Sequence, residues 1–482
     1  MRNAVFGLIA QRYTYDILLP QYFQMNRDAV IYLASRLGAA ALNLGAIALF
    51  TRLASPAVYG GYLIGFAGGY IVFATLFQWL IQAHFGLYAP ERAARLAGAL
   101  LALLGMMAGA AGLGLAAAMG LGLLALADGL ALAALLAGFV IYAAAVEIGR
   151  ARLMVGAVAL AGLGRGLAML MLGGAALWVA PSAPMLLAAV GLGQALAGLP
   201  ILLALRGAGI AAPARGDMRG LARFGAPLVL AFAAAALALH FDRLLLDGLA
   251  GAALVGLYGA IADLVRQSFV VVGEAVAAAY LSRAKATGPG TERAMALERA
   301  FATLWSLVLL GIAGWMALGP MLIGLLLGPD FAAAPPGLLE LIVIGTALLS
   351  LRAYYFAQAI YFAGGAGREV VSSLVMLAAG VGLALLLVPG LGVTGAAAAY
   401  LGAQAAGLAS LMLADRRTRL LPVQAKVVIE TLPICLGAGL AGAALAPLGW
   451  WSAALPLVLA TLALVWRHDL LGGAQWLARR RQ

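Results

Sequence analysis

Charged side chains are scarce in this chain. Asp, Glu, Lys and Arg make up 10% of the 482 residues, whereas 65% of the residues are hydrophobic and the mean hydropathy is +1.04. A soluble protein of this size could not bury so much apolar surface. The composition therefore excludes a soluble protein and predicts an all-α polytopic membrane protein.

Groups that form covalent bonds or hold cofactors are scarce as well. The single cysteine, Cys435, lies in a hydrophobic stretch, so this chain can form no internal disulfide and no cysteine metal cluster. The sequence has no P-loop, no glycine-rich nucleotide motif and no His/Cys/Glu metal set. These absences argue against ATP-driven pumping by this chain alone. We expect a transporter rather than an enzyme, without a cofactor, that uses an ion gradient, the membrane potential or the gradient of its substrate.

Hydrophobic runs dominate what is present. A membrane-spanning helix needs about 20 mostly apolar residues. By this rule the chain contains about fourteen candidates, near 30–51, 59–82, 97–119, 129–148, 153–179, 183–205, 224–246, 253–278, 299–325, 338–361, 370–388, 394–413, 425–446 and 449–466.

The net charge of +12 is a topology signal and does not indicate a nucleic-acid partner. With the N-terminus in the cytoplasm, 24 of the 30 Lys and Arg residues fall in inside segments, and the outside loops hold only Arg52 and Arg243. A wrong number of spans would scramble this alternation. The positive-inside rule therefore supports fourteen spans with both termini in the cytoplasm.

The chain also contains an internal repeat. Aligning Gly60, at the start of the second span, with Gly256, at the start of the eighth, also aligns Tyr62 with Tyr258. The two copies are six spans apart and run in the same direction. Parallel repeats of this kind are typical of secondary transporters, whose substrate site lies between two lobes.

The repeat divides the chain into five expected segments. These are a cytoplasmic N-terminal segment (1–29), a lobe of helices 1–6 (30–205), a cytoplasmic linker (206–223), a second lobe of helices 7–12 (224–414), and two additional helices with a basic cytoplasmic tail (415–482).

Four arginines lie inside predicted spans: Arg36, Arg165, Arg266 and Arg352. An arginine near a helix centre costs roughly 2.5–3.5 kcal/mol on insertion scales, so it usually faces a bundle interior or a wet cavity. We predict that these four contact an anionic substrate in a cationic cavity. Two alternatives stay open: Arg36 could reach the headgroups from its helix end, and Arg165 could bond a backbone carbonyl of a neighbouring helix.

The eighth span carries a polar stripe. Asp263, Arg266, Gln267 and Glu274 follow one another at offsets of 0, 3, 4 and 11, which places all four on one helix face. Asp263 and Glu274 are candidates for binding a coupling ion, H⁺ or Na⁺. An Asp263–Arg266 ion pair that only holds the fold is the alternative.

A second polar cluster lies near the end of the seventh span. It consists of His240, Asp242, Arg243 and Asp247. We interpret this cluster as an interfacial cap of the helix, with an outer gate as the alternative.

Three stretches resemble a known family. They are 35–38 (SRLG) with 53–62 (LASPAVYGGY); 224–228 (FGAPL) with 242–246 (DRLLL) and 255–259 (VGLYG); and 387–397 (LVPGLGVTGAA). Together, in this order and on a fourteen-span frame, they resemble the polysaccharide-transporter branch of the multidrug/oligosaccharidyl-lipid/polysaccharide exporter superfamily. The N-terminal extension of about 28 residues departs from that pattern.

The resemblance implies a Wzx-type flippase in the bacterial inner membrane. Such proteins move undecaprenyl-diphosphate-linked oligosaccharides to the outer leaflet for O-antigen, capsule or exopolysaccharide assembly. It implies two six-helix lobes around a cationic cavity and two further helices. The implied partners are the lipid-linked oligosaccharide, membrane lipids, a glycan polymerase and a chain-length regulator. The alternatives are a flippase of the same fold for the peptidoglycan lipid precursor, a cation-coupled drug exporter, and a membrane-embedded glycan polymerase or ligase.

Overall fold

The computed structural model describes residues 34–205, 209–281, 284–285, 290–359, 366–416 and 420–468. Within these ranges the chain is helical and contains no strand. Thirteen of its helices are long and apolar enough to cross a membrane. The expected N-terminal segment and most of the expected basic tail lie outside the described residues.

Membrane-length helices fill the first half of the chain. They are Ala34–Leu53, α2 (Pro56–Phe73) running through η1 (Ala74–Gln78) into α3 (Trp79–Leu87), α4 (Ala93–Gly120), α5 (Leu126–Ala151), α6 (Val155–Val179) and α7 (Ala183–Ala204). The residues at the start of α2 explain why the helix begins there. The Ser55 hydroxyl accepts a hydrogen bond from the Val58 amide at 3.4 Å, and Pro56 occupies the first helical position.

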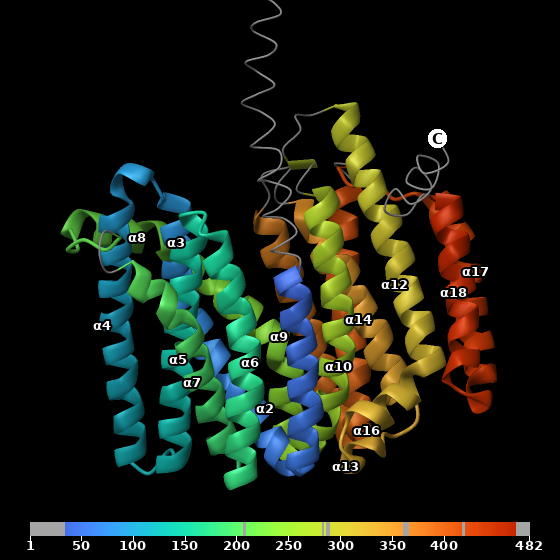
Figure 1. Cartoon of the computed structure of the whole chain (residues 1–482), viewed down its shortest axis with the longest axis horizontal. Helices are drawn as coiled ribbons and strands as arrows, with labels where there is room; N and C mark the ends of the chain where they lie inside the picture. Colours follow the sequence, from blue (N-terminus) through green and yellow to red (C-terminus); the bar gives the residue numbers. More distant parts are fainter. Residues whose placement is uncertain are drawn as a thin grey trace, which may run out of the picture.

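The second half begins with a short helix, α8 (Arg215–Gly225), that lies across the end of the bundle (Figure 1). The longer elements are α9 (Val229–Ala250), α10 (Ala252–Val276) with η4 (Ala277–Leu281), α12 (Thr291–Leu326), α14 (Leu338–Tyr354), α16 (Ala366–Arg416), α17 (Ala425–Leu445) and α18 (Trp450–His468).

The element α16 is two helices folded back on each other. The break is at Gly392, whose φ of 54° a glycine adopts without strain. Across the hairpin, the Ser372 hydroxyl donates to the carbonyl oxygen of Gly407 at 2.8 Å. Counting the two halves separately turns the thirteen membrane-length helices into fourteen, the expected number. The described residues are helical, so the expected all-α fold is confirmed.

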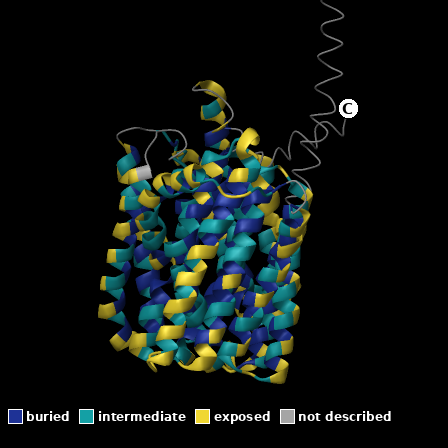
Figure 2. Ribbon diagram, turned by 90° about the vertical axis from the view of Figure 1, so that its left-hand side faces the viewer, coloured by how far each residue is buried: buried dark blue, intermediate teal, exposed yellow. Residues whose placement is uncertain are grey.

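The long helices run side by side in one bundle, with α4 at one edge and α17 and α18 at the other (Figure 1). The last two helices pack against each other and against α12. Viewed from the α4 side, exposed residues cover the outward faces of the helices and buried residues lie behind them (Figure 2). This is the arrangement expected when the outer faces contact lipid.

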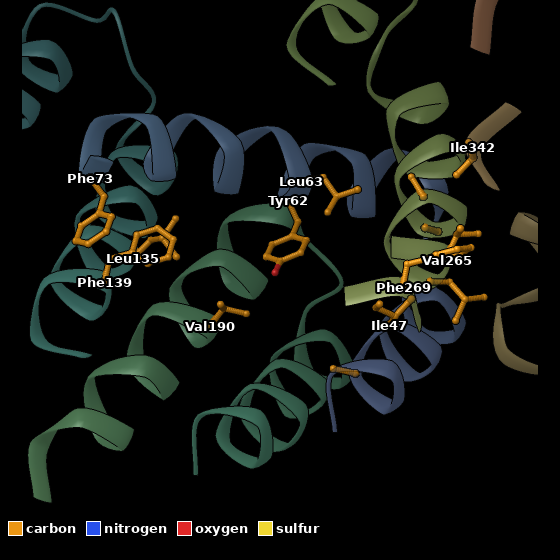
Figure 3. Close-up of a cluster of buried hydrophobic side chains, with 14 of the residues drawn as sticks. Ile47, Tyr62, Leu63, Phe73, Leu135, Phe139, Val190, Val265, Phe269 and Ile342 are labelled. Carbon is orange, nitrogen blue, oxygen red and sulfur yellow. The ribbon is translucent and has the colours of Figure 1, made fainter. Parts of the chain in front are cut away.

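The two halves of the bundle, here called the N-lobe (helices before residue 206) and the C-lobe (helices after residue 225), meet along α2 and α10. Figure 3 shows Tyr62 and Leu63 of α2 between a cluster around Phe139 and a second cluster around Phe269. The helices touch at Gly60 and Gly256: a Cβ on Gly60 would overlap the carbonyl of Ala252, and one on Gly256 would overlap that of Pro56. These reciprocal contacts are what a twofold relation between the two copies of the repeat produces.

Further contacts close the lobes at the same end of the bundle. The Gly328 amide donates to the Thr51 hydroxyl at 3.1 Å. The Arg52 guanidinium donates to the carbonyls of Leu325 and Leu326, at the C-terminal end of α12. We call the contacts made by Thr51, Arg52, Gly60, Gly256 and Gly328 the seal. It closes one end of the lobe interface, and the candidate site lies on the other side of it.

Candidate functional site

A polar cavity lies between the lobes in two connected chambers. The first, called the Arg36 chamber, has a volume of about 340 Å³ and is lined by the first helix, α5, α6 and α10. The second, called the Arg266 chamber, has a volume of about 250 Å³ and extends toward the seal, where Tyr59 and Tyr62 line it. Residues Asn43, Arg165, Gln267 and Val270 line both chambers, so the two form one cavity.

The polar stripe of α10 faces this cavity along its length. Asp263, Arg266 and Gln267 line the Arg266 chamber, and Gln267 and Glu274 line the Arg36 chamber. A helix repeats every 3.6 residues, so these offsets leave the polar groups on one side of α10 and most of its apolar residues on the other. The deeply buried Val265 and Phe269 belong to that apolar side (Figure 3).

The mouth of the Arg36 chamber carries an ion pair between the lobes. Arg36, on the first helix, pairs with Glu274 of α10, and their side chains are 43% and 33% exposed. Arg150 of α5 lines the same chamber and pairs with Glu147 at 3.3 Å. Such exposure means that water screens the Arg36–Glu274 attraction, so this contact can separate at low cost.

The Arg266 chamber is built on a denser charge network. Arg243 of α9 pairs with Asp263, and Arg266 lies 3.9 Å from both Asp242 and Asp263. Asp242 also accepts a hydrogen bond from the Tyr258 hydroxyl at 2.7 Å. The Asp263–Arg266 ion pair of the alternative interpretation is therefore present, but it is the longer of the two pairs that Asp263 makes.

The ring of Tyr400 lies beneath this network, with the Arg266 guanidinium 5.5 Å from its centroid. A cation over an aromatic face is stabilised by the ring quadrupole. Arg266 is thus held by an aromatic ring and two carboxylates rather than by a single partner.

The interpretation of His240, Asp242 and Arg243 as an interfacial cap was wrong. All three are buried, with exposed fractions of 5%, 2% and 3%, and His240 and Arg243 line the Arg266 chamber. Hydropathy places residue 243 near a helix end, and only the packing of α9 against α10 turns its side chain inward. The signal that could have found Arg243 is the adjacent Asp-Arg pair within an otherwise apolar run, because such charges rarely face lipid.

Arg165 occupies the junction of the two chambers. Its guanidinium lies 5.2 Å from the centroid of the Tyr142 ring. No carboxylate of the described residues approaches it within the 4.0 Å of an ion pair. The hydrogen bonds of the described residues also include none from Arg165 to a backbone carbonyl, the alternative left open by the sequence.

Arg352 lies away from both chambers. It is 8% exposed on α14, pairs with Glu369 at 2.7 Å, and packs against Gly407 of the α16 hairpin. The structure thus brings together three of the four intramembrane arginines, and it adds Arg150 and Arg243, which were not among the arginines expected in the cavity.

The cavity lining has an excess of positive charge. It contains five arginines, Arg36, Arg150, Arg165, Arg243 and Arg266, and two carboxylates, Asp263 and Glu274. Asp242 and Glu147 pair with two of these arginines from behind the lining, which leaves five positive against four negative charges. The remaining positive charge is that of Arg165. A net charge between low-dielectric walls attracts the opposite charge, so the cavity favours an anion.

No protein-family model matches the sequence, and no curated protein matches it. Several solved structures are similar to this chain. The lipid II flippase MurJ in an inward closed conformation superimposes with a TM-score of 0.73 at 10% identity, over 92% of this chain and 100% of that chain.

Two multidrug transporters of the MATE family are also similar. An inward-facing transporter of the MOP superfamily gives a TM-score of 0.54 at 16% identity, over 81% of this chain and 98% of that one. The transporter DinF-BH gives 0.57 at 15% identity, over 82% and 95%. At these identities the likeness shows the fold: this chain is a multi-pass membrane protein with the helical architecture of MurJ and the MATE transporters.

Proposed function

We propose that this protein is a flippase that moves an undecaprenyl-diphosphate-linked oligosaccharide across the bacterial inner membrane by alternating access. The observation that carries the proposal is Arg165, a cation at the junction of two chambers between the lobes that has no carboxylate partner among the described residues. A diphosphate offers such a guanidinium two oxygens in the geometry of a bidentate pair.

The cavity suits an amphipathic anion. Arginines, carboxylates and amides line it, and amides such as Asn43 and Gln267 can bond sugar hydroxyls. The outward helix faces are apolar and suit the polyprenyl chain, which can stay in lipid while the polar head occupies the cavity. In this proposal Arg36, Arg165 and Arg266 contact the diphosphate or an acidic sugar, and we leave Arg352 out because it lies away from the cavity.

Alternating access requires that the lobes part at the seal and close at the other end. Asp263 and Glu274 are proposed to couple this change to H⁺ or Na⁺. Each holds an arginine in the present state, Arg243 and Arg36 respectively. A proton or sodium ion on either carboxylate would release its arginine toward the substrate. Coupling would then need no nucleotide hydrolysis.

A second candidate is a flippase for the peptidoglycan lipid precursor. The likeness to the lipid II flippase MurJ, with a TM-score of 0.73 over 92% of this chain, favours it. Both cargoes offer a polyprenyl diphosphate, so the charge argument applies to both. A drug exporter for cations is disfavoured by the positive excess of the lining. For oligosaccharide export, we propose a glycan polymerase and a chain-length regulator as partners.

The test is the sidedness of lipid-linked sugars in the host lacking this chain and complemented with variants. Arg165→Gln is expected to let the lipid-linked oligosaccharide accumulate facing the cytoplasm, with surface glycan lost, while the protein stays inserted. Arg467→Gln is the matched control, because Arg467 lies on α18, outside the cavity, and pairs with Glu430 at 2.9 Å. It should leave export unchanged.

The other outcomes separate the alternatives. Arg352→Gln should lower the yield of folded protein, because it removes the ion-pair partner of Glu369, whose side chain is 32% exposed, but should preserve export per inserted molecule. Loss of peptidoglycan synthesis with normal surface glycan would favour the second candidate. Intermediates that accumulate facing outward and unpolymerised would mean that the chain acts after flipping, as an enzyme. Normal export with Arg165→Gln would overturn the proposed role of Arg165.

A further inference from the structure

A row of arginines on α8 is not used by the transport cavity. Arg215, Arg219 and Arg223 are spaced by four residues on an eleven-residue helix, and all three are exposed. A spacing of four keeps side chains on one face of a helix, at a rise of 1.5 Å per residue. The three guanidinium groups therefore form a row about 12 Å long on one side of α8.

The opposite face of α8 is anchored to the N-lobe. Leu221 is fully buried, and a Cβ on Gly225 would overlap the ring and carbonyl of Trp79, at the start of α3. Before the helix, the Ala211 amide donates to the Ala94 carbonyl at 3.0 Å, which ties this segment to α4. The row of arginines is thus presented by a rigid support.

Within the part of the chain that the structure describes, the charge of the three α8 arginines is not balanced by a neighbouring carboxylate. Asp217, on the anchored side, lies 3.9 Å from Arg92 and 3.8 Å from Arg95 at the start of α4. Among the described residues, no carboxylate lies within 4.0 Å of Arg215, Arg219 or Arg223. Three cations on one helix face, with two more beside them, attract an anionic surface.

The location of α8 indicates what kind of anionic surface the three arginines would contact. The helix lies across the ends of α3 and α4, at the end of the bundle opposite the seal (Figure 1). The chain then enters the membrane-spanning α9 through Phe224 and Leu230, which are 47% and 81% exposed. Exposed apolar side chains next to a basic helix face are the pattern of a helix lying in the lipid interface.

We propose that the arginine row of α8, defined as Arg215, Arg219 and Arg223, binds the headgroups of anionic phospholipids. The spacing and the position at the end of the bundle fit phosphates held in a lipid leaflet, rather than a free anion, because all three side chains are exposed. Each arginine near an anionic membrane surface contributes about fivefold to binding, so three contribute roughly a hundredfold. The site is distinct from the cavity and does not depend on what the cavity transports.

The experiment titrates the purified full chain with phosphatidylglycerol or phosphatidylcholine and counts bound lipids by native mass spectrometry. The variant with Arg215→Gln, Arg219→Gln and Arg223→Gln should bind phosphatidylglycerol roughly a hundredfold more weakly, with phosphatidylcholine binding unchanged. A control with Arg299→Gln, Arg416→Gln and Arg467→Gln removes the same charge from other exposed positions. It should keep the preference for phosphatidylglycerol.

Three results would overturn the proposal. The first is an α8 variant that binds phosphatidylglycerol as the unaltered chain does, as would hold if the row binds an acidic protein. The second is a control that loses the preference equally, which would indicate a general charge effect. The third is displacement of the lipid by inorganic phosphate, which would indicate a site for a free anion. Lysine at the same three positions should retain binding, and it keeps the test valid if the glutamine variant unfolds.

Discussion

The two ends of the lobe interface close in different ways. At the seal, backbone meets backbone, because Gly60 and Gly256 leave no room for a Cβ. At the other end, the cavity separates the first helix from α10, and the half-exposed Arg36–Glu274 pair links them across it. One end depends on the shape of the backbone and the other on charges that water can reach.

This difference indicates how the lobes can exchange states. Close helix crossings through glycine gain van der Waals contact over many atoms and tolerate no added volume. An exposed ion pair contributes little and reforms with other partners, including a substrate anion. The seal therefore carries more of the energy that holds the present state, while the charged end responds to the substrate.

The largest effect should come from adding a methyl group at the seal. Gly60→Ala would place a Cβ against the backbone carbonyl of Ala252, which cannot move without the helix, and overpacking of this kind costs about 1–3 kcal/mol. We expect the lobes to part there. A cysteine introduced at Ile47, in the Arg266 chamber, should then become reactive to a membrane-impermeant maleimide.

Gly68, on the same helix α2, provides the control for Gly60→Ala. A Cβ on Gly68 would have nothing within 4 Å, so Gly68→Ala tests the change in helix propensity alone. Cys435 should be replaced by serine so that only the introduced thiol reacts. Equal labelling in the two alanine variants would show that the glycine crossing does not hold this end closed.

Gly256→Ala tests the same helix crossing from the C-lobe side. Its Cβ would meet the carbonyl of Pro56, so the single variant should resemble Gly60→Ala in labelling and in thermal stability. Because one crossing is disrupted twice, the double variant should lose less stability than the sum of the two single losses. A thermodynamic cycle on the purified chain measures this, and strict additivity would mean that the two contacts are independent.

A smaller effect is expected at the rim of the seal. Arg52→Gln removes a cation that caps the last carbonyls of α12 from the other lobe, a contact worth about 1 kcal/mol at an exposed position. The unfolding temperature in detergent should fall slightly and labelling at Ile47 should rise. Arg52→Lys keeps the charge and should recover part of the lost stability. No recovery would mean that the contact requires the two guanidinium nitrogens that donate to the two carbonyls.

The smallest stability effect should come from the charged end. Arg36→Glu places two acidic groups together at Glu274, and exposure limits the cost to less than about 1 kcal/mol. Exchanging the partners, with Arg36→Glu and Glu274→Arg in one chain, should restore the unfolding temperature. An exchange variant as unstable as the single variant would indicate that the pair has further partners.

Much of the fold could be predicted from local patterns, and less of the site. The spans were found because bilayer thickness sets a length that hydrophobic runs reveal, and the stripe of α10 was found because helix periodicity sets a face. Arg243 was misplaced because its inward direction depends on where α10 lies, and local sequence does not contain that information. For Arg352, hydropathy could not distinguish an ion pair with Glu369 from a position in the cavity.

The sequence by itself determined the fourteen helices, the parallel repeat and the faces that carry charge, because each follows from chain-local length and periodicity. Tertiary structure alone decided which arginines share a cavity, that Arg165 lies at the junction of its chambers, and that Gly60 meets Gly256. These features depend on the distances between helices far apart along the chain, which only the packing of the whole bundle sets.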